Sequence, residues 1–307
     1  MKPSLITLVL VLALMSAWVQ AACAFNADGH MIAAALAYRQ LDPATKRAVD
    51  ALLKQHPEYR VWKRSFKSGL GVDLGTYAFM RASAWPDEIR RSGDPFDHPN
   101  WHFVDYPLRP PQFPSEPRPA PTDDVLFGMN ESEGIIADTS VPARTRAAHL
   151  SWLIHLTADI HQPLHCSSLF NATYPAPDGD RGGNRFFIRP AQVGIKLHSF
   201  WDGLLGSSGT PRTLLNGAID LGSRFPATSF PQLDTHLTVE SWTTESRSLA
   251  IHVAYNLGSL EGHDAASSAL TVSAQYLAAA KDLGEKQVAL AGYRLAKQIR
   301  ALLPGGP

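Results

Sequence analysis

The chain has 307 residues, of which 45% are hydrophobic and 18% are charged, and this composition excludes intrinsic disorder as its main state. The 28 Lys and Arg residues balance the 28 Asp and Glu residues, so no bulk positive field attracts nucleic acid or an anionic membrane. Any anionic substrate must therefore be held by charge that is gathered locally.

The first 24 residues have the pattern of a secretory signal peptide. Lys2 precedes an almost entirely apolar run at 5–15, and the small residues Ala22-Cys23-Ala24 end the segment. The pattern predicts cleavage after Ala24 and a periplasmic or secreted protein whose mature domain is 25–307. An uncleaved membrane anchor is the alternative. Cleavage would leave Cys166 without an internal disulfide partner.

The mature part is predicted to be mainly helical. Apolar residues recur at helical spacing from Asp28 to Gln40, and Asp42-Pro43 supplies an N-cap and a first-turn proline. Further helices are expected near 74–91, 122–138, 143–161, 211–223, 239–256, 267–281 and 285–303. Seven prolines at 107–121 predict an irregular loop, and 184–195 is the best strand or hairpin candidate. No linker divides the chain, so we expect one all-α domain with a minor β-hairpin.

Two histidine–aspartate pairs carry the first chemical signal. His155 and Asp159 are four residues apart, as are His198 and Asp202, and this spacing places both side chains on one face of a helix. Imidazole nitrogens and carboxylate oxygens are good zinc ligands. A single pair is more often part of an ordinary core or surface, whereas two pairs flanking His165 indicate a metal site.

Several longer motifs together resemble the three-zinc, single-strand-specific nucleases that also act as 3′-nucleotidases and share a superfamily with zinc-dependent phospholipase C. The resemblance extends from Phe25 to about Leu303. The motifs are Phe25-x-x-x-Gly-His30, Trp85-x-Asp-x-x-Arg90, Trp101-His-Phe103, His155-x-x-x-Asp-x-x-Gln-Pro-Leu-His165, Asp180-x-Gly-Gly-Asn184 and Leu197-His-x-x-Trp-Asp202. The resemblance implies the helical phospholipase C/nuclease-like fold and three bound zinc ions.

The resemblance also assigns the zinc ligands. The ligands of the first zinc would be Asp87, His102, His155 and Asp159. A second zinc close to it would be bound by His30, by the amine and carbonyl of Phe25, and again by Asp159. The ligands of the third zinc would be His165, His198 and Asp202. The family usually begins with Trp where this chain has Phe25, but main-chain atoms bind the metal, so we expect little loss. The family usually has Asn at the position of Lys196, which makes one substrate contact uncertain.

The implied reaction is hydrolysis of single-stranded DNA or RNA to 5′-phosphorylated products, together with 3′-nucleotidase activity. Two zinc ions about 3.5–4 Å apart would share a hydroxide that attacks phosphorus. Asp87 and Asp159 would act as catalytic ligands, and Arg90 would contact the phosphate. By resemblance, Phe103 would stack on a base and Asp105 would accept hydrogen bonds from it.

Asn184 and Lys196 are further candidates for substrate contacts. Because duplex DNA hides its bases, a pocket that stacks one base favours single strands. A monomer without stable membrane association after cleavage is expected. The alternatives are a zinc-dependent phospholipase C, whose third-zinc carboxylate is typically Glu where this chain has Asp202, and a zinc-binding module without catalysis. A non-catalytic module would lack Arg90 and Phe103, which are both present.

Overall fold

The structure is a computed structural model that describes residues 25–257, 260 and 262–304. The predicted signal peptide at 1–24 lies outside the described residues, so it stays a prediction.

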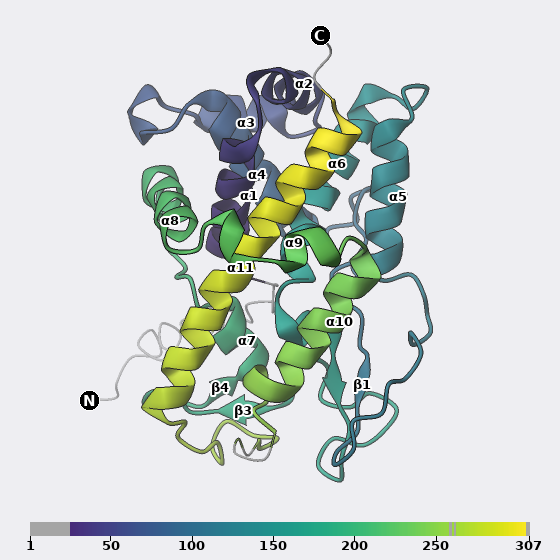
Figure 1. Ribbon diagram of the computed structural model, residues 1–307, viewed down its shortest axis with the longest axis vertical. Helices are drawn as coiled ribbons and strands as arrows, with labels where there is room; N and C mark the ends of the chain where they lie inside the picture. The colour runs from purple at the N-terminus through teal and green to yellow at the C-terminus, as the bar shows by residue number, and fades with distance from the viewer. Residues whose placement is uncertain (1–24, 258–259, 261, 305–307) are drawn as a thin grey trace, which may run out of the picture.

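One alanine-rich helix forms the centre of the molecule. Helix α1 (Ala27–Gln40) is buried along most of its length and packs against α4 (Leu74–Ile89), α8 (Pro211–Arg224) and α11 (Ala274–Leu302). Its small alanine side chains let neighbouring helices approach closely on several sides. Helix α6 (Ala143–Asp159) packs against α4 and α11, and α11 runs diagonally across almost the whole molecule (Figure 1).

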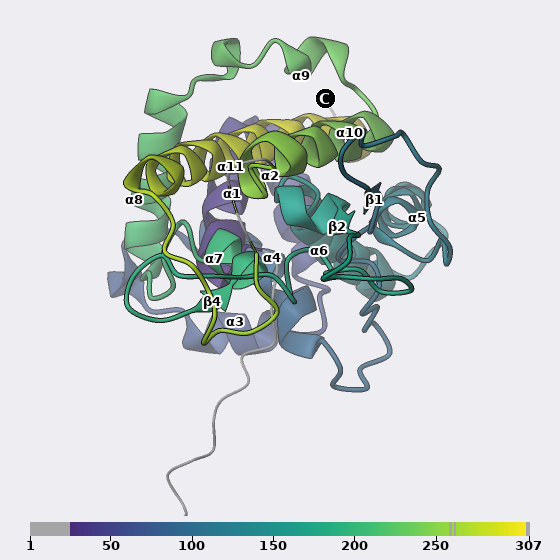
Figure 2. The same ribbon diagram turned by 90° about the horizontal axis from the view of Figure 1, so that it is seen from below.

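The remaining helices surround this centre. They are α2 (Pro43–Leu53), α3 (Tyr59–Ser65), α5 (Val125–Ala137), α7 (Leu197–Asp202), α9 (Gln232–Thr235) and α10 (Val239–Leu249), with 3₁₀ turns η1 (Ser68–Leu70), η2 (Pro163–Cys166) and η3 (Ala227–Ser229) and a π-helical turn η4 (Ala250–Ala254). The segment that contains α9 arches over α10 and α11 (Figure 2). None of the helices in the described ranges is both long enough and apolar enough to cross a bilayer.

Local sequence explains where the first helices begin. Asp42 is the N-cap of α2, as predicted, and its carboxylate accepts the N–H groups of Ala44 and Thr45, each at 2.9 Å. Asn26 caps α1 by accepting the Gly29 N–H at 3.2 Å. A Cβ at position 29 would lie 2.8 Å from the Cβ of Phe25, so glycine lets the chain before the helix fold back against its first turn.

Several helix predictions need correction. The helices expected at 267–281 and 285–303 are one helix, α11, which runs through Gly284 because that glycine packs against Leu204. The helix expected at 239–256 ends as an α-helix at Leu249 and continues as the π-helical turn η4. Helix α3 was not predicted, and the helices expected at 74–91 and 143–161 end at Ile89 and Asp159.

Two short, two-stranded sheets join segments that lie between the helices. The predicted hairpin is confirmed as β3 (Phe187–Ile188) paired antiparallel with β4 (Ile195–Lys196). In addition, β1 (Pro107–Leu108) pairs in parallel with β2 (Ser168–Leu169), although the sequence predicted an irregular loop from 107 onward. This second pairing joins the segment after His102 to the segment after His165. The predicted single, mainly helical domain with a minor hairpin is confirmed.

Candidate metal centre

Eight of the predicted ligand side chains come together in three groups. Within each group the candidate ligand atoms lie within 4.8 Å of one another. The groups are His30, His155 and Asp159; Asp87, His102 and His155; and His165, His198 and Asp202. We call these eight residues the metal centre. All are buried except Asp87, whose side chain is 9% exposed.

The ends of several helices position these side chains. His30 lies in the first turn of α1, and Asp87 lies in the last turn of α4. The pair His155 and Asp159 ends α6, whereas His165 follows on η2. His198 and Asp202 are on α7 and share one face of that short helix, as their spacing predicted.

Asp159 lies between the first two groups. Its Oδ1 is 3.3 Å from Nε2 of His30, and its Oδ2 is 3.1 Å from both Nε2 of His155 and Nδ1 of His102. Oδ1 of Asp87 lies 3.7 Å from Nδ1 of His102 and 3.8 Å from Nε2 of His155. The two oxygens of Asp159 therefore face different groups, which is the geometry of a carboxylate that bridges two cations.

Backbone carbonyls fix the tautomers of three histidines. Nδ1–H of His155 donates to the Ser83 carbonyl at 2.7 Å, and Nδ1–H of His165 donates to the His102 carbonyl at 2.6 Å. Nδ1–H of His198 donates to the Gly182 carbonyl. When such a ring is neutral, Nε2 carries the lone pair, and this arrangement is the usual one for a histidine ligand whose second nitrogen is held by the protein.

The metal centre holds several buried polar atoms that lack a hydrogen-bond partner. In the part of the chain that the structure describes, such atoms include both ring nitrogens of His30, both carboxylate oxygens of Asp87, Nε2 of His102, Oδ1 of Asp159, Nε2 of His165 and Oδ2 of Asp202. Buried polar atoms are nearly always hydrogen-bonded. Nitrogen and oxygen donors gathered in this way are the ligand set that zinc prefers, so the residues fit the metal that the motifs predicted.

The electrostatics of the metal centre also suit a cation. Burial lowers the pKa of His155, but the nearby Asp159 and Asp87 carboxylates outweigh burial and raise the pKa to about 9. The negative charge that favours a proton there would equally favour a metal ion. Burial is the main cause that lowers the pKa of His165 to about 4 and that of His198 to about 3. Both rings are therefore neutral at pH 7 and can bind metal.

The start of the described chain lies against the third group. Phe25 is fully buried, and the N–H of its neighbour Asn26 donates to the backbone carbonyl of Asp202 at 2.9 Å. Phe25 thus lies beside α7 and one turn from His30. The role of its amine and carbonyl as ligands stays a prediction.

Arg90 lies at the C-cap of α4, just beyond Asp87. Its guanidinium donates to the Pro99 carbonyl at 3.4 Å. After burial and other neighbouring groups, its charge also contributes to the lowered pKa values of His165 and His198. The positive group is therefore close enough to influence the third group of ligands.

The predicted substrate-binding residues flank the metal centre, and their roles stay predictions. Half-buried Phe103 follows His102 directly. Burial, together with Asp180, raises the pKa of Asp105 to about 7, although Arg181 opposes the shift. The other two predicted substrate-binding residues are Asn184 and Lys196. The side-chain amide of Asn184 donates to the Arg181 carbonyl at 3.0 Å, and half-buried Lys196 is the N-cap residue of α7.

Two supporting side chains were not assigned from sequence. Gln162 is fully buried and donates from Nε2 to Oδ1 of Asp202 at 2.9 Å, while its Oε1 accepts the Leu164 N–H at 2.6 Å. The ring of Trp152 contacts His102 edge-on, with the ring centroids 5.2 Å apart. Gln162 belongs to the motif around His165, so the motif itself was the signal for its importance.

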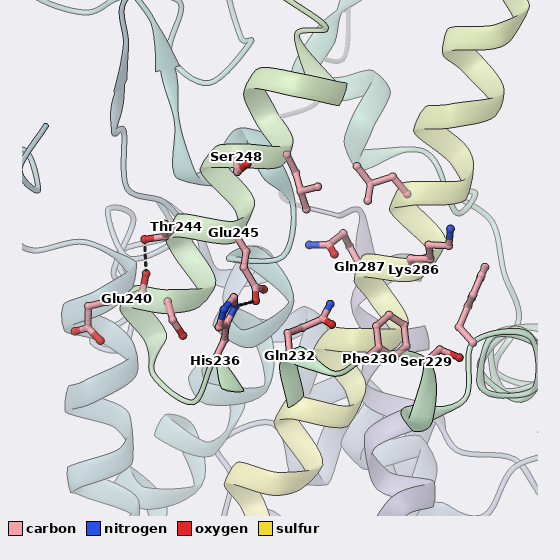
Figure 3. A pocket seen from close by; sticks show the side chains of 14 residues that line it. Ser229, Phe230, Gln232, His236, Glu240, Thr244, Glu245, Ser248, Lys286 and Gln287 are labelled. Atoms are coloured by element: carbon pink, nitrogen blue, oxygen red, sulfur yellow. Dashed lines mark hydrogen bonds and ion pairs between the residues drawn. The ribbon is translucent and has the colours of Figure 1, made fainter. Parts of the chain in front are cut away.

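A large pocket of the described structure lies elsewhere. It has a volume of about 980 Å³ and lies between α10, α11 and the arch that contains α9 (Figure 3). None of the described residues that line it belongs to the metal centre. One of its two glutamates, Glu245, is already bound by Arg294 and His236.

Comparisons with known proteins agree with this geometry. The family model described as S1/P1 Nuclease matches residues 25–304. Endonuclease 4 of Arabidopsis thaliana is 25% identical over 256 residues, which cover 73% of this chain and 77% of the relative. Endonuclease 3 of the same plant is 25% identical over 243 residues, with 71% and 74% coverage.

Proposed function

Because the chain belongs to the S1/P1 nuclease family, it is an enzyme that hydrolyses phosphodiester bonds in nucleic acid, and we propose that it is a three-zinc, single-strand-specific nuclease and 3′-nucleotidase. The family is metal-dependent, and the metal centre provides the clusters of His and Asp that a metal needs. The resemblance expected from the sequence motifs is confirmed. The number and identity of the metals, the strand preference and the nucleotidase activity belong to the proposal.

One observation carries the proposal: three groups of buried nitrogen and oxygen atoms converge, and several of these atoms lack a hydrogen-bond partner in the described structure. Three divalent cations held by only three carboxylates would leave a strongly positive centre inside a chain of formal net charge +0. That local charge supplies the attraction for phosphate that the overall composition lacks. Bound zinc would supply Lewis acidity and a water molecule of lowered pKa.

The residues of the chain then have separate tasks. Asp159 holds the first two groups together through its two oxygens, and Asp87 completes the second group. Arg90 contributes a fork of N–H donors to the phosphate oxygens, on which negative charge develops as the nucleophile attacks. The neutral imidazoles of His165 and His198, with Asp202, would hold the third metal, which would supply positive charge to stabilise the departing 3′ oxygen. Cleavage of the bond between phosphorus and that oxygen leaves the phosphate on the 5′ side.

The proposed preference for single strands rests on the residues beside His102. Phe103 offers a ring for stacking on one base, and Asp105, Asn184 and Lys196 offer polar contacts around it. Stacking contributes about 1–3 kcal/mol per base without selecting a sequence. A base within a duplex is not available for such a contact.

Hydrolysis assays with metal analysis test this proposal directly. Purified enzyme should cleave single-stranded DNA and RNA at least about tenfold faster than duplex DNA and release 5′-phosphorylated products. It should also release phosphate from 3′-nucleotides. A chelator should abolish each activity, and zinc should restore it. Fewer than three zinc ions per active chain, or equal rates on both DNA forms, would contradict the proposal.

The same samples distinguish the phospholipase C alternative. Hydrolysis of phosphatidylcholine without release of acid-soluble nucleotides would support that alternative. The presence of Asp202, where the phospholipases typically have Glu, and the match to a nuclease family model both favour the nuclease.

We also propose that the chain is exported as a monomer and that cleavage before Phe25 completes the metal centre. The close packing of Phe25 against Gly29, next to His30, and the hydrogen bond from Asn26 to the Asp202 carbonyl bring this end of the mature chain to the metal centre. An α-amine has a pKa near 7.7–8.0 and binds metal only when it is deprotonated, whereas an amide nitrogen lacks that lone pair. Adding one residue before Phe25 should therefore remove most activity. Full activity of the extended protein would refute this role.

A further inference from the structure

A largely buried loop connects the third group of ligands to the π-helical turn η4. The loop, 180–184, follows the strand β2 and precedes the hairpin that leads into α7. The Gly182 carbonyl accepts Nδ1–H of His198, and the Gly183 carbonyl accepts the His198 backbone N–H at 3.3 Å. Two consecutive carbonyls of this loop therefore set both the position and the tautomer of His198.

The loop has an unusual backbone conformation that the surrounding structure must hold. Arg181, Gly182 and Gly183 have φ angles of 56°, 60° and 80°, three successive residues in the left-handed region. That region is disfavoured for Arg181, which carries a Cβ. A Cβ at position 182 would lie 2.4 Å from the Leu164 carbonyl oxygen, so the loop also presses against η2, which carries His165.

Asp180 is the side chain that holds this loop. It is fully buried, and its Oδ2 accepts the Gly183 N–H at 3.0 Å while its Oδ1 accepts the Leu169 N–H at 2.8 Å. The carboxylate thus clamps the loop to the end of β2. Oδ2 of Asp180 also accepts a hydrogen bond of 2.7 Å from the hydroxyl of Tyr255.

Tyr255 reaches Asp180 from the π-helical turn that ends α10. It is fully buried, and its N–H donates to the Ala250 carbonyl at 2.8 Å, five residues back. Single π-turns within α-helices are rare and are found frequently at functional sites. Here the turn directs a tyrosine into the carboxylate that organises the loop.

We propose that Tyr255 is a positioning residue for the third zinc, acting through Asp180 and the 180–184 loop on His198. This inference rests on the proposed function, because it takes His198 as a zinc ligand. Removing the Tyr255 hydroxyl takes one of two donors from Oδ2 of Asp180 and loosens its hold on Gly183. Partners of metal-ligating histidines typically change metal affinity by about 10–100-fold when they are mutated. The first two zinc ions, held through Asp159, are not touched by this chain of contacts.

Tyr174 provides a matched control. It is as buried as Tyr255, belongs to the same hydrophobic cluster and also packs against Phe186. In the described structure its hydroxyl lacks a hydrogen-bond partner. Tyr174→Phe and Tyr255→Phe therefore remove the same group from the same core, but only Tyr255→Phe breaks a bond to Asp180.

Zinc-binding isotherms test the proposal. The cleaved wild-type enzyme and both variants are stripped with chelator, dialysed against graded free zinc and analysed for zinc per chain. We expect Tyr255→Phe to need about 10–100-fold more free zinc for one of its three equivalents, with activity restored at high zinc. Tyr174→Phe should follow the wild type. If wild type and Tyr255→Phe bind three zinc ions identically, this inference is wrong even if the variant melts earlier. If the wild type binds fewer than three, the proposed function fails first.

Ser168→Ala gives a second, milder perturbation of the same loop. The Ser168 hydroxyl accepts the Arg181 N–H at 3.1 Å, and its own proton faces both the Asp178 carbonyl at 3.3 Å and Oδ1 of Asp180 at 3.4 Å. It should weaken the same zinc equivalent by a smaller factor. A folded Ser168→Ala protein with an unchanged isotherm would count against the loop as the path of the effect, whether or not Tyr255→Phe folds.

Discussion

Two buried clusters of histidines and acids lie on opposite sides of the C-terminal end of α6. One is the metal centre. The other, which we call the Arg294 cluster, consists of His161, Glu245 and Arg294. In the Arg294 cluster the guanidinium binds Glu245 through two bonds of 2.7 and 2.9 Å and donates to Nε2 of His161 at 2.8 Å. Nδ1–H of His161 donates to the Thr157 carbonyl at 2.6 Å.

The difference between the clusters lies in where the positive charge comes from. The Arg294 cluster contains its own cation, and both ring nitrogens of His161 have partners. In the metal centre, by contrast, acids and imidazoles face one another with several atoms unsatisfied. His161, six residues after His155, thus belongs to an ion network, while His155 belongs to the proposed ligand set. Burial and residue type alone do not separate the two roles; the hydrogen bonds do.

The largest effect should come from Asp159→Asn. This change keeps the shape of the side chain but removes the charge shared by the first two groups of ligands. We expect activity to fall at least about a thousandfold, as for the loss of a central electrostatic group, and bound zinc to fall below three per chain. Activity assays and metal analysis check this, with exposed Asp220→Asn as the control. If Asp159→Asn bound the normal amount of zinc, the proposed difference between the metal centre and the Arg294 cluster would be wrong.

Arg294→Met should have the reciprocal effect. It leaves Glu245, only 16% exposed, without its bidentate partner, and unpaired buried charges are strongly destabilising. We expect a loss of about 3 kcal/mol in the free energy of unfolding, measured by denaturant titration. Zinc content and activity of the protein that remains folded should be unchanged. The double variant Glu245→Gln/Arg294→Met should recover part of the loss; an additive or larger loss would show that the ion pair is not the cause.

The sequence predicted most of the helices because their signals are local. Asp42-Pro43 marks the start of α2 through a cap and a fixed φ angle, and such signals depend on few neighbours. The single helix through Gly284 was missed because the compensating contact comes from Leu204, 80 positions away in the chain. The π-helical turn before Tyr255 was not predicted for a similar reason, because the hydrogen-bond partner of Tyr255 is Asp180, which is distant in the chain.

Helical spacing predicted two pairs of the candidate metal centre, and the resemblance to the nuclease family assigned the other ligands. His155 and Asp159, or His198 and Asp202, lie on one helical face whatever the rest of the fold does. The supporting contacts could not be predicted in this way. The carbonyls of Ser83 and Gly182 orient two of the histidines, yet a carbonyl leaves no trace in residue identity. Only the three-dimensional structure shows which carbonyl lies behind which ring.

Arg90→Lys should have a smaller effect on the reaction than Asp159→Asn. The substitution keeps the positive charge near His165 but loses the planar fork that binds two phosphate oxygens. We expect kcat/KM to fall about 10–100-fold with zinc content unchanged. The adjacent exposed residue provides a control, because Arg91→Lys should leave kcat/KM unaltered. If Arg90→Lys lost zinc instead, Arg90 would belong to the architecture of the metal centre rather than to substrate binding.

The smallest effect concerns a buried histidine outside both clusters. His56 packs between Trp62 and Trp85, and burial, followed by the charge of Arg144, lowers its pKa to about 3. The unfolded chain, with a histidine pKa near 6.5, then binds the proton more readily than the folded chain. The contribution of His56 to stability is therefore complete above pH 6.5 and is lost as the pH falls toward 3.

His56→Asn isolates this contribution. The Asn side chain does not titrate, and its carbonyl oxygen can replace Nδ1, which accepts the Glu58 N–H at 3.0 Å. Unfolding free energies are measured in chelator at pH 7, 6 and 5, so that release of metal does not enter. The variant will be less stable at pH 7 because it loses ring packing, but the gap to the wild type should narrow by up to about 1.4 kcal/mol per pH unit below 6.5. A constant gap would mean that the pKa of His56 is the same in the folded and unfolded chains, and that burial between two tryptophans does not keep this histidine neutral.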